Sequence, residues 1–147
     1  MATVELRFSA LPAHVRTARL VAAAVARRSG VDEAVLDEVR LAVGEACSRA
    51  VHLHRRHCPE VPVMVTLIDD EKAFSVAVTD EAPQGQREEQ GTLADLAASA
   101  AESTDPDQEL VIPEVGLAVI TGLVEDVEVA PGRDRGVVVT MSWPISV

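Results

Sequence analysis

Aromatic residues are almost missing from this 147-residue chain, which has two phenylalanines, one tryptophan and no tyrosine. Its core must therefore be aliphatic. The chain also has too few aromatic side chains to form a platform on which nucleic-acid bases could stack. Basic residues are also a minority, since 13 Lys and Arg face 24 Asp and Glu, for a formal net charge of -11. Because this charge repels a phosphate backbone, we expect no nucleic-acid partner.

Long hydrophobic runs and a cysteine framework are missing as well. No apolar run approaches the roughly 20 residues that a bilayer requires, and the segment 1–8 lacks the basic start and apolar stretch of a signal peptide. We therefore expect a cytoplasmic protein with no membrane partner. The two cysteines, Cys47 and Cys58, are expected to stay reduced.

The chain does have the apolar periodicity of a folded α/β domain, and its length fits a single domain over residues 1–147. In chain order the pattern predicts a strand at 4–8, a helix at about 12–28, a second helix between its cap Asp32 and Pro59, strands at 61–68 and 73–79, a helix at 113–123, and strands at 127–129 and 137–142. This order predicts a two-layer sandwich of helices on a mostly antiparallel, mixed sheet.

The segment 81–114 differs in character from the rest of the chain. Its acidic residues far outnumber the single Arg87, and small residues dominate around 97–101. A stretch of this kind within a compact domain is more often a lid or binding loop than a rigid element, although 93–101 could form a short helix.

Several local strings occur in the order of a known family over nearly the whole chain. They are Phe8-Ser9-Ala10-Leu11 with Ala18-Arg19, Leu41-Ala42-Val43-Gly44-Glu45-Ala46-Cys47, Val78-Thr79-Asp80, and Gly116-Leu117 with the segment 123–127. The set resembles the anti-sigma kinases of the SpoIIAB and RsbW type, which belong to the GHKL superfamily of ATPases (HATPase domain) and share the Bergerat nucleotide fold.

The resemblance implies a nucleotide site with Glu45 as general base and Asp80 as the acceptor of a hydrogen bond from the adenine amino group. It also places Gly85, Gly116 and Leu117 at the nucleotide, with 81–114 as the ATP lid. Simpler interpretations remain open for both acids. Glu45 could pair with a helix neighbour four residues on, and Asp80 could simply start a turn after its strand.

Three positions depart from the family pattern. Arg49 stands where the family has an asparagine that helps to hold Mg²⁺, and arginine offers five donors but no acceptor. Its charge could instead bind phosphate directly or neutralise Glu45. Ala82 and Glu114 stand where the family has glycine. We therefore expect weak or absent binding of ATP or ADP and a doubtful Mg²⁺ site.

Partner binding is the other role that the resemblance implies. Arg19 matches an arginine that, in proteins of the SpoIIAB type, contacts both the sigma factor and the STAS-domain antagonist. Arg16 lies one turn earlier on the same helix. A solvated basic helix face is the alternative for both arginines. The family usually forms homodimers through the sheet edge and the adjoining helix, so a homodimer is expected by resemblance.

The sequence thus predicts a regulator of transcription that acts by partner switching, binding a STAS-domain anti-anti-sigma factor, a sigma factor or both, with impaired use of ATP. The alternative is an active protein serine kinase that phosphorylates the STAS partner. A third possibility is a zinc-binding regulator, because His54, His57 and Cys58 share a helical face near His52. This group lies at an Arg-flanked helix end that opposes a cation, so no metal site is expected.

Overall fold

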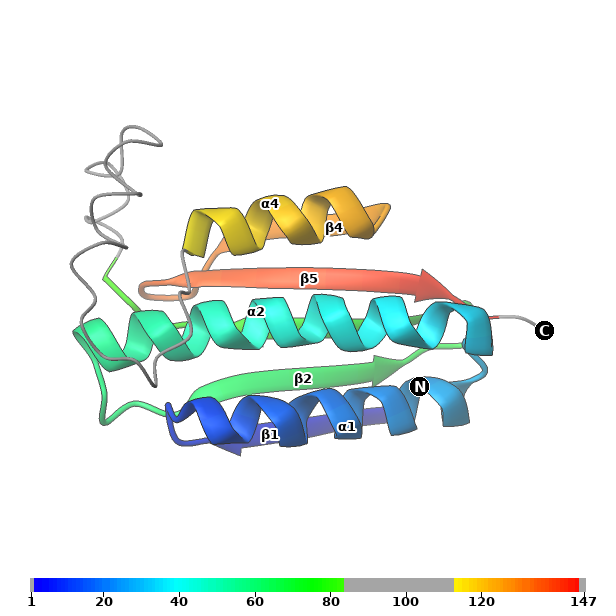
Figure 1. Ribbon diagram of the computed structural model, residues 1–147, viewed down its shortest axis with the longest axis horizontal. Coiled ribbons are helices and arrows are strands. Elements are labelled where there is room, and N and C mark those ends of the chain that lie inside the picture. Colours follow the sequence, from blue (N-terminus) through cyan, green and yellow to red (C-terminus); the bar gives the residue numbers. More distant parts are fainter. Residues whose placement is uncertain (1, 84–112, 146–147) are drawn as a thin grey trace.

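The structure, a computed structural model, describes residues 2–83 and 113–145. A five-stranded sheet forms one layer, and long helices lie side by side on one face of that sheet (Figure 1). Residues 84–112, which make up most of the predicted lid at 81–114 and include its possible helix at 93–101 and Gly85, fall outside the described residues.

The strands of the sheet are ordered β1-β2-β3-β5-β4, and each described pair is antiparallel. Their bounds are β1 (Ala2–Phe8), β2 (Val63–Asp69), β3 (Ala73–Thr79), β4 (Asp126–Pro131) and β5 (Val137–Pro144). The helices are α1 (Pro12–Ser29), α2 (Leu36–His57) and α4 (Pro113–Leu123), with a short 3-10 turn at Glu33–Val35. The predicted two-layer α/β sandwich is therefore confirmed.

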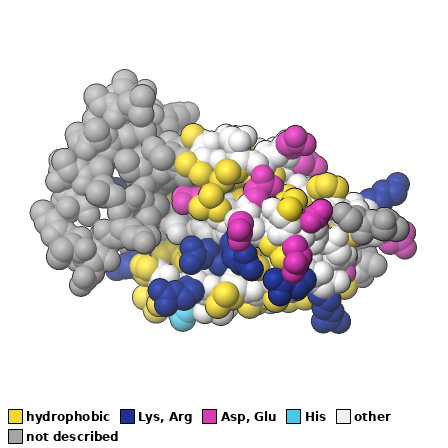
Figure 2. Space-filling view, turned by 45° about the vertical axis from the view of Figure 1, so that its right-hand side comes forward, with side chains coloured by type: hydrophobic (Ala, Val, Ile, Leu, Met, Phe, Trp, Pro, Cys, Tyr) yellow, Lys and Arg dark blue, Asp and Glu magenta, His cyan; other side chains and the backbone are white. Residues whose placement is uncertain are grey.

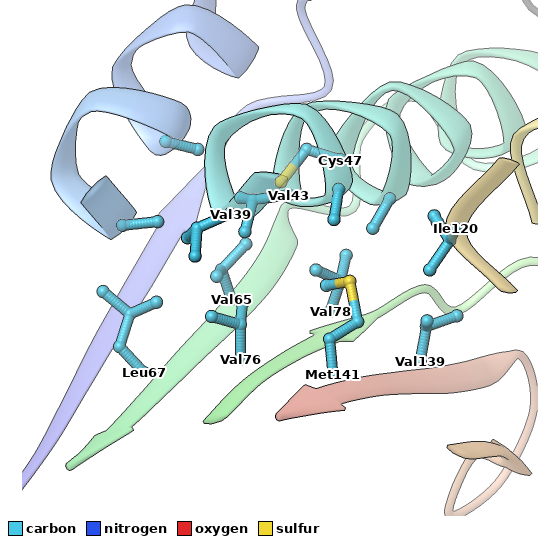
Figure 3. Close-up of a cluster of buried hydrophobic side chains, with 14 of the residues drawn as sticks. Val39, Val43, Cys47, Val65, Leu67, Val76, Val78, Ile120, Val139 and Met141 are labelled. Atoms are coloured by element: carbon cyan, nitrogen blue, oxygen red, sulfur yellow. The ribbon is translucent and has the colours of Figure 1, made fainter. Parts of the chain in front are cut away.

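Strand alternation places the core between the two layers, because every second side chain of β2, β3 and β5 points toward the helices. Val65, Leu67, Val76, Val139 and Met141 are buried there against valines and alanines of α2 (Figure 3). With so few aromatic residues, small side chains fill this space and let the helices lie close to the sheet.

The helix ends show why the chain turns where it does. α1 stops at Gly30, whose φ of 104° is left-handed, a conformation that glycine adopts readily at helix ends. The Asp32 carboxylate accepts a hydrogen bond from the Ala34 N–H at 3.0 Å, so Asp32 caps the 3-10 turn and not α2. The predicted cap was therefore one turn too early, and α2 begins at Leu36.

Trp143, the single tryptophan of the chain, connects β5 to the start of α2. Trp143 on β5 stacks on Phe74 of β3 with ring centroids 6.2 Å apart, and its indole Nε1 donates to Glu38 Oε2 at 2.7 Å. None of the described helices has the length and apolar character needed to cross a membrane.

Candidate functional site

Asp80 lies one residue beyond the end of β3 and is held there by the backbone. Its N–H donates to the Val137 carbonyl at 3.0 Å, and the Val137 N–H donates back to the Asp80 carbonyl at 3.3 Å. Gly136 faces the backbone of Asp80 and has a φ of 78°. A Cβ added to Gly136 would lie 1.9 Å from the Asp80 carbonyl oxygen. The position of Asp80 therefore depends on the turn that precedes β5.

Arg49 approaches Asp80 from the flank of α2 that is turned away from α1. Gly44 faces α1, because a Cβ on Gly44 would meet the Arg19 side chain. Five residues further along the helix, Arg49 is rotated by about 140° from Gly44. That flank packs against α4, on the side of α2 opposite α1 (Figure 1).

Arg49 and Asp80 form an ion pair in the interior. Arg49 Nη1 donates to Asp80 Oδ2 at 2.8 Å, and the two side chains are only 6% and 2% exposed. The other carboxylate oxygen, Oδ1, accepts the Ala82 N–H at 3.1 Å. Arg49 Nε is also buried and has no hydrogen-bond partner within the described part of the chain. The charge of each group is therefore balanced inside the protein.

This pairing differs from both roles that the sequence suggested for Arg49. Arg49 neutralises Asp80 and not Glu45, although Glu45 lies one turn earlier on α2. Among the described residues Glu45 takes part in no ion pair, so the simple i,i+4 pair is absent. Glu45 itself is half-buried.

These residues, as they lie, do not fit a magnesium nucleotide. The guanidinium at position 49 supplies no oxygen ligand to a cation, and its charge repels one. The Asp80 carboxylate, which the family would offer to the adenine amino group, is almost fully buried and already accepts two hydrogen bonds. Adenine could reach it only if the groups that bury this carboxylate moved.

Two other predicted nucleotide residues, Gly116 and Leu117, lie on α4, the helix that flanks this site. Gly116 and Leu117 are in the first turns of α4, together with Glu114. Leu117 is half-buried against the hydrophobic core, a packing role that competes with ligand contact. Ala82, where the family has glycine, is buried, and its N–H fixes Asp80, so alanine is compatible with the turn seen here.

His54 is a site residue whose role was not predicted. It is fully buried, although Arg55 and Arg56, the next two residues of α2, are exposed. Its Nδ1–H donates to the Val61 carbonyl at 2.8 Å, and its Nε2 accepts the Glu81 N–H at 2.8 Å. The two backbone partners fix the tautomer. His54 thus anchors the chain directly after Asp80.

The signal for this role was present in the helical spacing, because His54 follows Ala50 by four residues on the apolar stripe of α2. With both ring nitrogens engaged, His54 has no lone pair for a metal ion. Across residues 2–83 and 113–145, no group of three His, Cys, Asp or Glu side chains could hold one.

Burial also controls the titratable groups near α2. It raises the pKa of the Cys47 thiol to about 12 and raises the pKa of Cys58, against the smaller opposing effect of Arg135. Partial burial lowers the pKa of His52, and Arg56, His57 and Arg55 lower it further. Both thiols are therefore protonated and unreactive at neutral pH.

The two predicted partner-binding arginines lie apart from this site. Arg16 and Arg19 are exposed on α1, at the flank of α2 opposite Arg49. Figure 2 shows Lys and Arg side chains gathered along the lower part of the molecule, where α1 lies, with hydrophobic atoms between them. The fold therefore separates the basic helix face from the Arg49–Asp80 pair.

Residues 8–143 match the histidine kinase-like ATPase domain family, and the chain belongs to that family. A crystal structure of the RsbU and RsbW domains of Rv1364c from Mycobacterium tuberculosis shares the fold, with a TM-score of 0.63 and 16% identity. That similarity covers 97% of this chain and 32% of the other, so this chain spans less than half of its neighbour. No curated protein is significantly similar in sequence. The predicted membership of the GHKL class is thus confirmed.

Proposed function

We propose that this protein is a partner-switching regulator of the anti-sigma type that makes little or no use of ATP. Its partners in this proposal are a STAS-domain anti-anti-sigma factor, a sigma factor or both. Family membership and the fold shared with a protein that contains an RsbW domain support the class. The observation that carries the loss of ATP use is the buried Arg49–Asp80 ion pair in the nucleotide site.

The physical reason is the cost of opening that pair. Nucleotide binding would have to expose or reorganise a buried guanidinium and carboxylate, and separating such a pair costs several kcal/mol, about 3–5 when one partner is lost. Phosphoryl transfer also relies on a metal ion to balance the phosphate charges, and position 49 opposes that ion.

Without nucleotide chemistry, switching depends on competition between protein partners. A partner present in excess, or bound more tightly, displaces the other from the shared surface. In this proposal the surface is the α1 face with Arg16 and Arg19, both of which are exposed. Homodimer formation is part of the proposal and is tested by sedimentation of the purified protein.

Titration calorimetry with ATP and ADP, with and without Mg²⁺, tests the proposal directly. We expect no saturable heat and no rise in the unfolding temperature at millimolar nucleotide. A ligand at a hundred times its Kd would add about 2.7 kcal/mol of stability, so even moderate binding would be visible. Micromolar, Mg-dependent binding of ATP would contradict the proposal.

Arg49→Asn tests the cause. It removes the cation, supplies the amide oxygen that the family uses and frees the Asp80 carboxylate, so Mg-nucleotide affinity should rise. Arg49→Lys is the matched control because it keeps a cation beside Asp80 and should bind no better than the wild type. Circular dichroism checks that both variants fold, because Arg49→Asn also leaves the Asp80 carboxylate without its cation.

An active serine kinase is the second candidate, and one observation favours it. Glu45, at the family's general-base position, is half-buried and is not neutralised by any described ion pair. Transfer of the labelled γ-phosphate of ATP to a co-purified STAS protein, abolished by Glu45→Gln, would establish this activity and replace the first proposal.

Partner identity is tested by co-purification of the native protein followed by mass spectrometry and calorimetry with the identified protein. We expect a STAS-domain protein or a sigma factor, with binding weakened at least about fivefold by Arg19→Ala. If neither class of protein binds the purified chain, the partner-switching proposal fails.

A further inference from the structure

Arg19 lies flat across α2 at the position of Gly44. A Cβ on Gly44 would be 2.6 Å from Arg19 Cδ, 3.3 Å from Cγ and 3.6 Å from Nη1. Three atoms along one side chain therefore pass over one glycine. The closest of these distances is shorter than real Cβ contacts, so any other residue at position 44 would move the Arg19 side chain.

The backbone gives no separate reason for glycine at this position. Within the described residues, the glycines with positive φ are Gly30 and Gly136, while Gly44 is inside α2. Glycine in a helix interior is unfavourable relative to alanine. What position 44 provides is space, and the group that occupies the space is the stem of Arg19.

Two exposed leucines lie beside this contact. Leu41 on α2 is 46% exposed and precedes Gly44 by one helical turn, and Leu20 on α1 is 62% exposed and follows Arg16 by one turn. Arg19, held over α2, joins the α1 and α2 parts into one basic and apolar surface. An arginine beside leucines is a combination that protein interfaces favour.

The charge of this surface indicates its partner. The chain as a whole carries a formal net charge of -11, yet the α1 face is basic (Figure 2). An acidic protein surface that also offers apolar side chains is complementary to this basic and apolar surface.

We propose that Gly44 is a positioning residue for partner binding: it seats Arg19 across α2, so that Arg16, Arg19, Leu20 and Leu41 form one docking surface for an acidic protein. The inference rests on the proposed function, since the partner is the STAS-domain protein or sigma factor of that proposal. Gly44 acts through Arg19 and need not touch the partner itself.

Gly44→Ala is the central test, with Gly122→Ala as its matched control. Gly122 lies in α4 with nothing within 4 Å of an added Cβ, so both variants exchange a helical glycine for alanine, and only Gly44→Ala displaces Arg19. We expect Gly122→Ala to raise the urea midpoint slightly and leave affinity unchanged. Gly44→Ala should keep the protein folded and weaken binding of the co-purified partner about tenfold.

The double variant Gly44→Ala/Arg19→Ala shows whether the effect passes through Arg19. We expect it to bind no more weakly than Arg19→Ala alone, because the space at position 44 has no function once the Arg19 side chain is removed. Additive losses, or wild-type affinity in folded Gly44→Ala, would overturn the inference while leaving the proposed function intact.

A readout without a partner separates the two proposals. The Arg19 Nε–Hε NMR signal should shift and exchange faster with water in Gly44→Ala than in the wild type or Gly122→Ala. If no STAS or sigma partner binds the wild type, the proposed function fails, whereas an unchanged Arg19 signal in Gly44→Ala refutes the seating of Arg19 by itself.

Discussion

A buried arginine and a buried aspartate stabilise a fold only as a pair, because either one alone leaves an uncompensated charge away from water. Arg49 and Asp80 are in this situation, 31 positions apart in the chain and 2.8 Å apart in space. The contact between them is internal to the protein. It therefore makes a prediction about stability that is independent of any ligand.

Arg49→Met should lower the free energy of unfolding by about 3–5 kcal/mol, since it strands the Asp80 carboxylate. Arg49→Met/Asp80→Asn, which removes both charges at similar volume, should recover most of that loss. Urea denaturation followed by fluorescence measures both variants. If the double variant lost as much unfolding free energy as Arg49→Met and Asp80→Asn lose together, the two side chains would not depend on each other.

Cys47 predicts how stability changes at alkaline pH. Burial raises its pKa from 9.0 to about 12, so the folded state favours the neutral thiol. That contribution is complete below pH 9 and is lost as pH rises toward 12, at up to about 1.4 kcal/mol per pH unit. The chain has no tyrosine and a single lysine, Lys72, so few other groups titrate there.

The measurement is urea unfolding at several values of pH between 7 and 10.5. Cys47→Ala should show a flatter pH dependence than the wild type, even if its stability at pH 7 is lower because of the cavity. Equal slopes for the two proteins would mean that another group is responsible.

At the scale of residues, the sequence predicted which positions matter but not which of them are in contact. It singled out positions 49 and 80 through the family resemblance, but nothing in the spacing indicated that they meet. Their contact depends on how α2 packs over the end of β3, which is a tertiary property. His54 could have been recognised from its place on an apolar stripe, whereas its backbone partners Val61 and Glu81 could not.

Elements were easier to predict than contacts, because alternation and helical spacing are local properties. The predicted ranges of α4, 113–123, and of β3, 73–79, match the structure, and β2 and β5 differ from their predicted ranges by one or two residues at an end. The predicted start of α2 was wrong because Asp32 caps the preceding 3-10 turn. The sequence pattern does not distinguish such a turn from the first turn of an α-helix.

The turn between β4 and β5 should tolerate change poorly at Gly136. Alanine there would be strained at a φ of 78°, and its Cβ would meet the Asp80 carbonyl oxygen. We expect Gly136→Ala to cost about 3 kcal/mol or more in unfolding free energy. Thermal and urea unfolding measure this, and Gly122→Ala, with open space around it, is the control. A loss below about 1 kcal/mol would show that the turn can relax.

At the scale of the whole molecule, one hydrophobic core connects all the described layers. It includes residues of α1, α2 and α4 as well as the central strands. The pattern of apolar residues leaves the strand order open, because local periodicity does not say which strands are neighbours. The order of the predicted helices and strands indicated the two-layer architecture, and the structure supplied the strand order β1-β2-β3-β5-β4.

A shared core predicts cooperative unfolding. Trp143 reports on β5, β3 and the start of α2 through its contacts with Phe74 and Glu38. Its fluorescence transition in urea should coincide with the loss of helix measured by far-UV circular dichroism. Glu38→Gln should leave the two curves superimposed while lowering their common midpoint. Separate midpoints in the wild type would show that the helices and the sheet unfold independently.

The contact between Arg49 and Asp80 also constrains how such a domain can evolve. Each side chain is the counterion of the other, so a lineage that changes one of them first passes through a less stable protein. The two positions are therefore epistatic. Replacement of both residues in succession would require a stability reserve elsewhere in the chain before the first substitution could be tolerated.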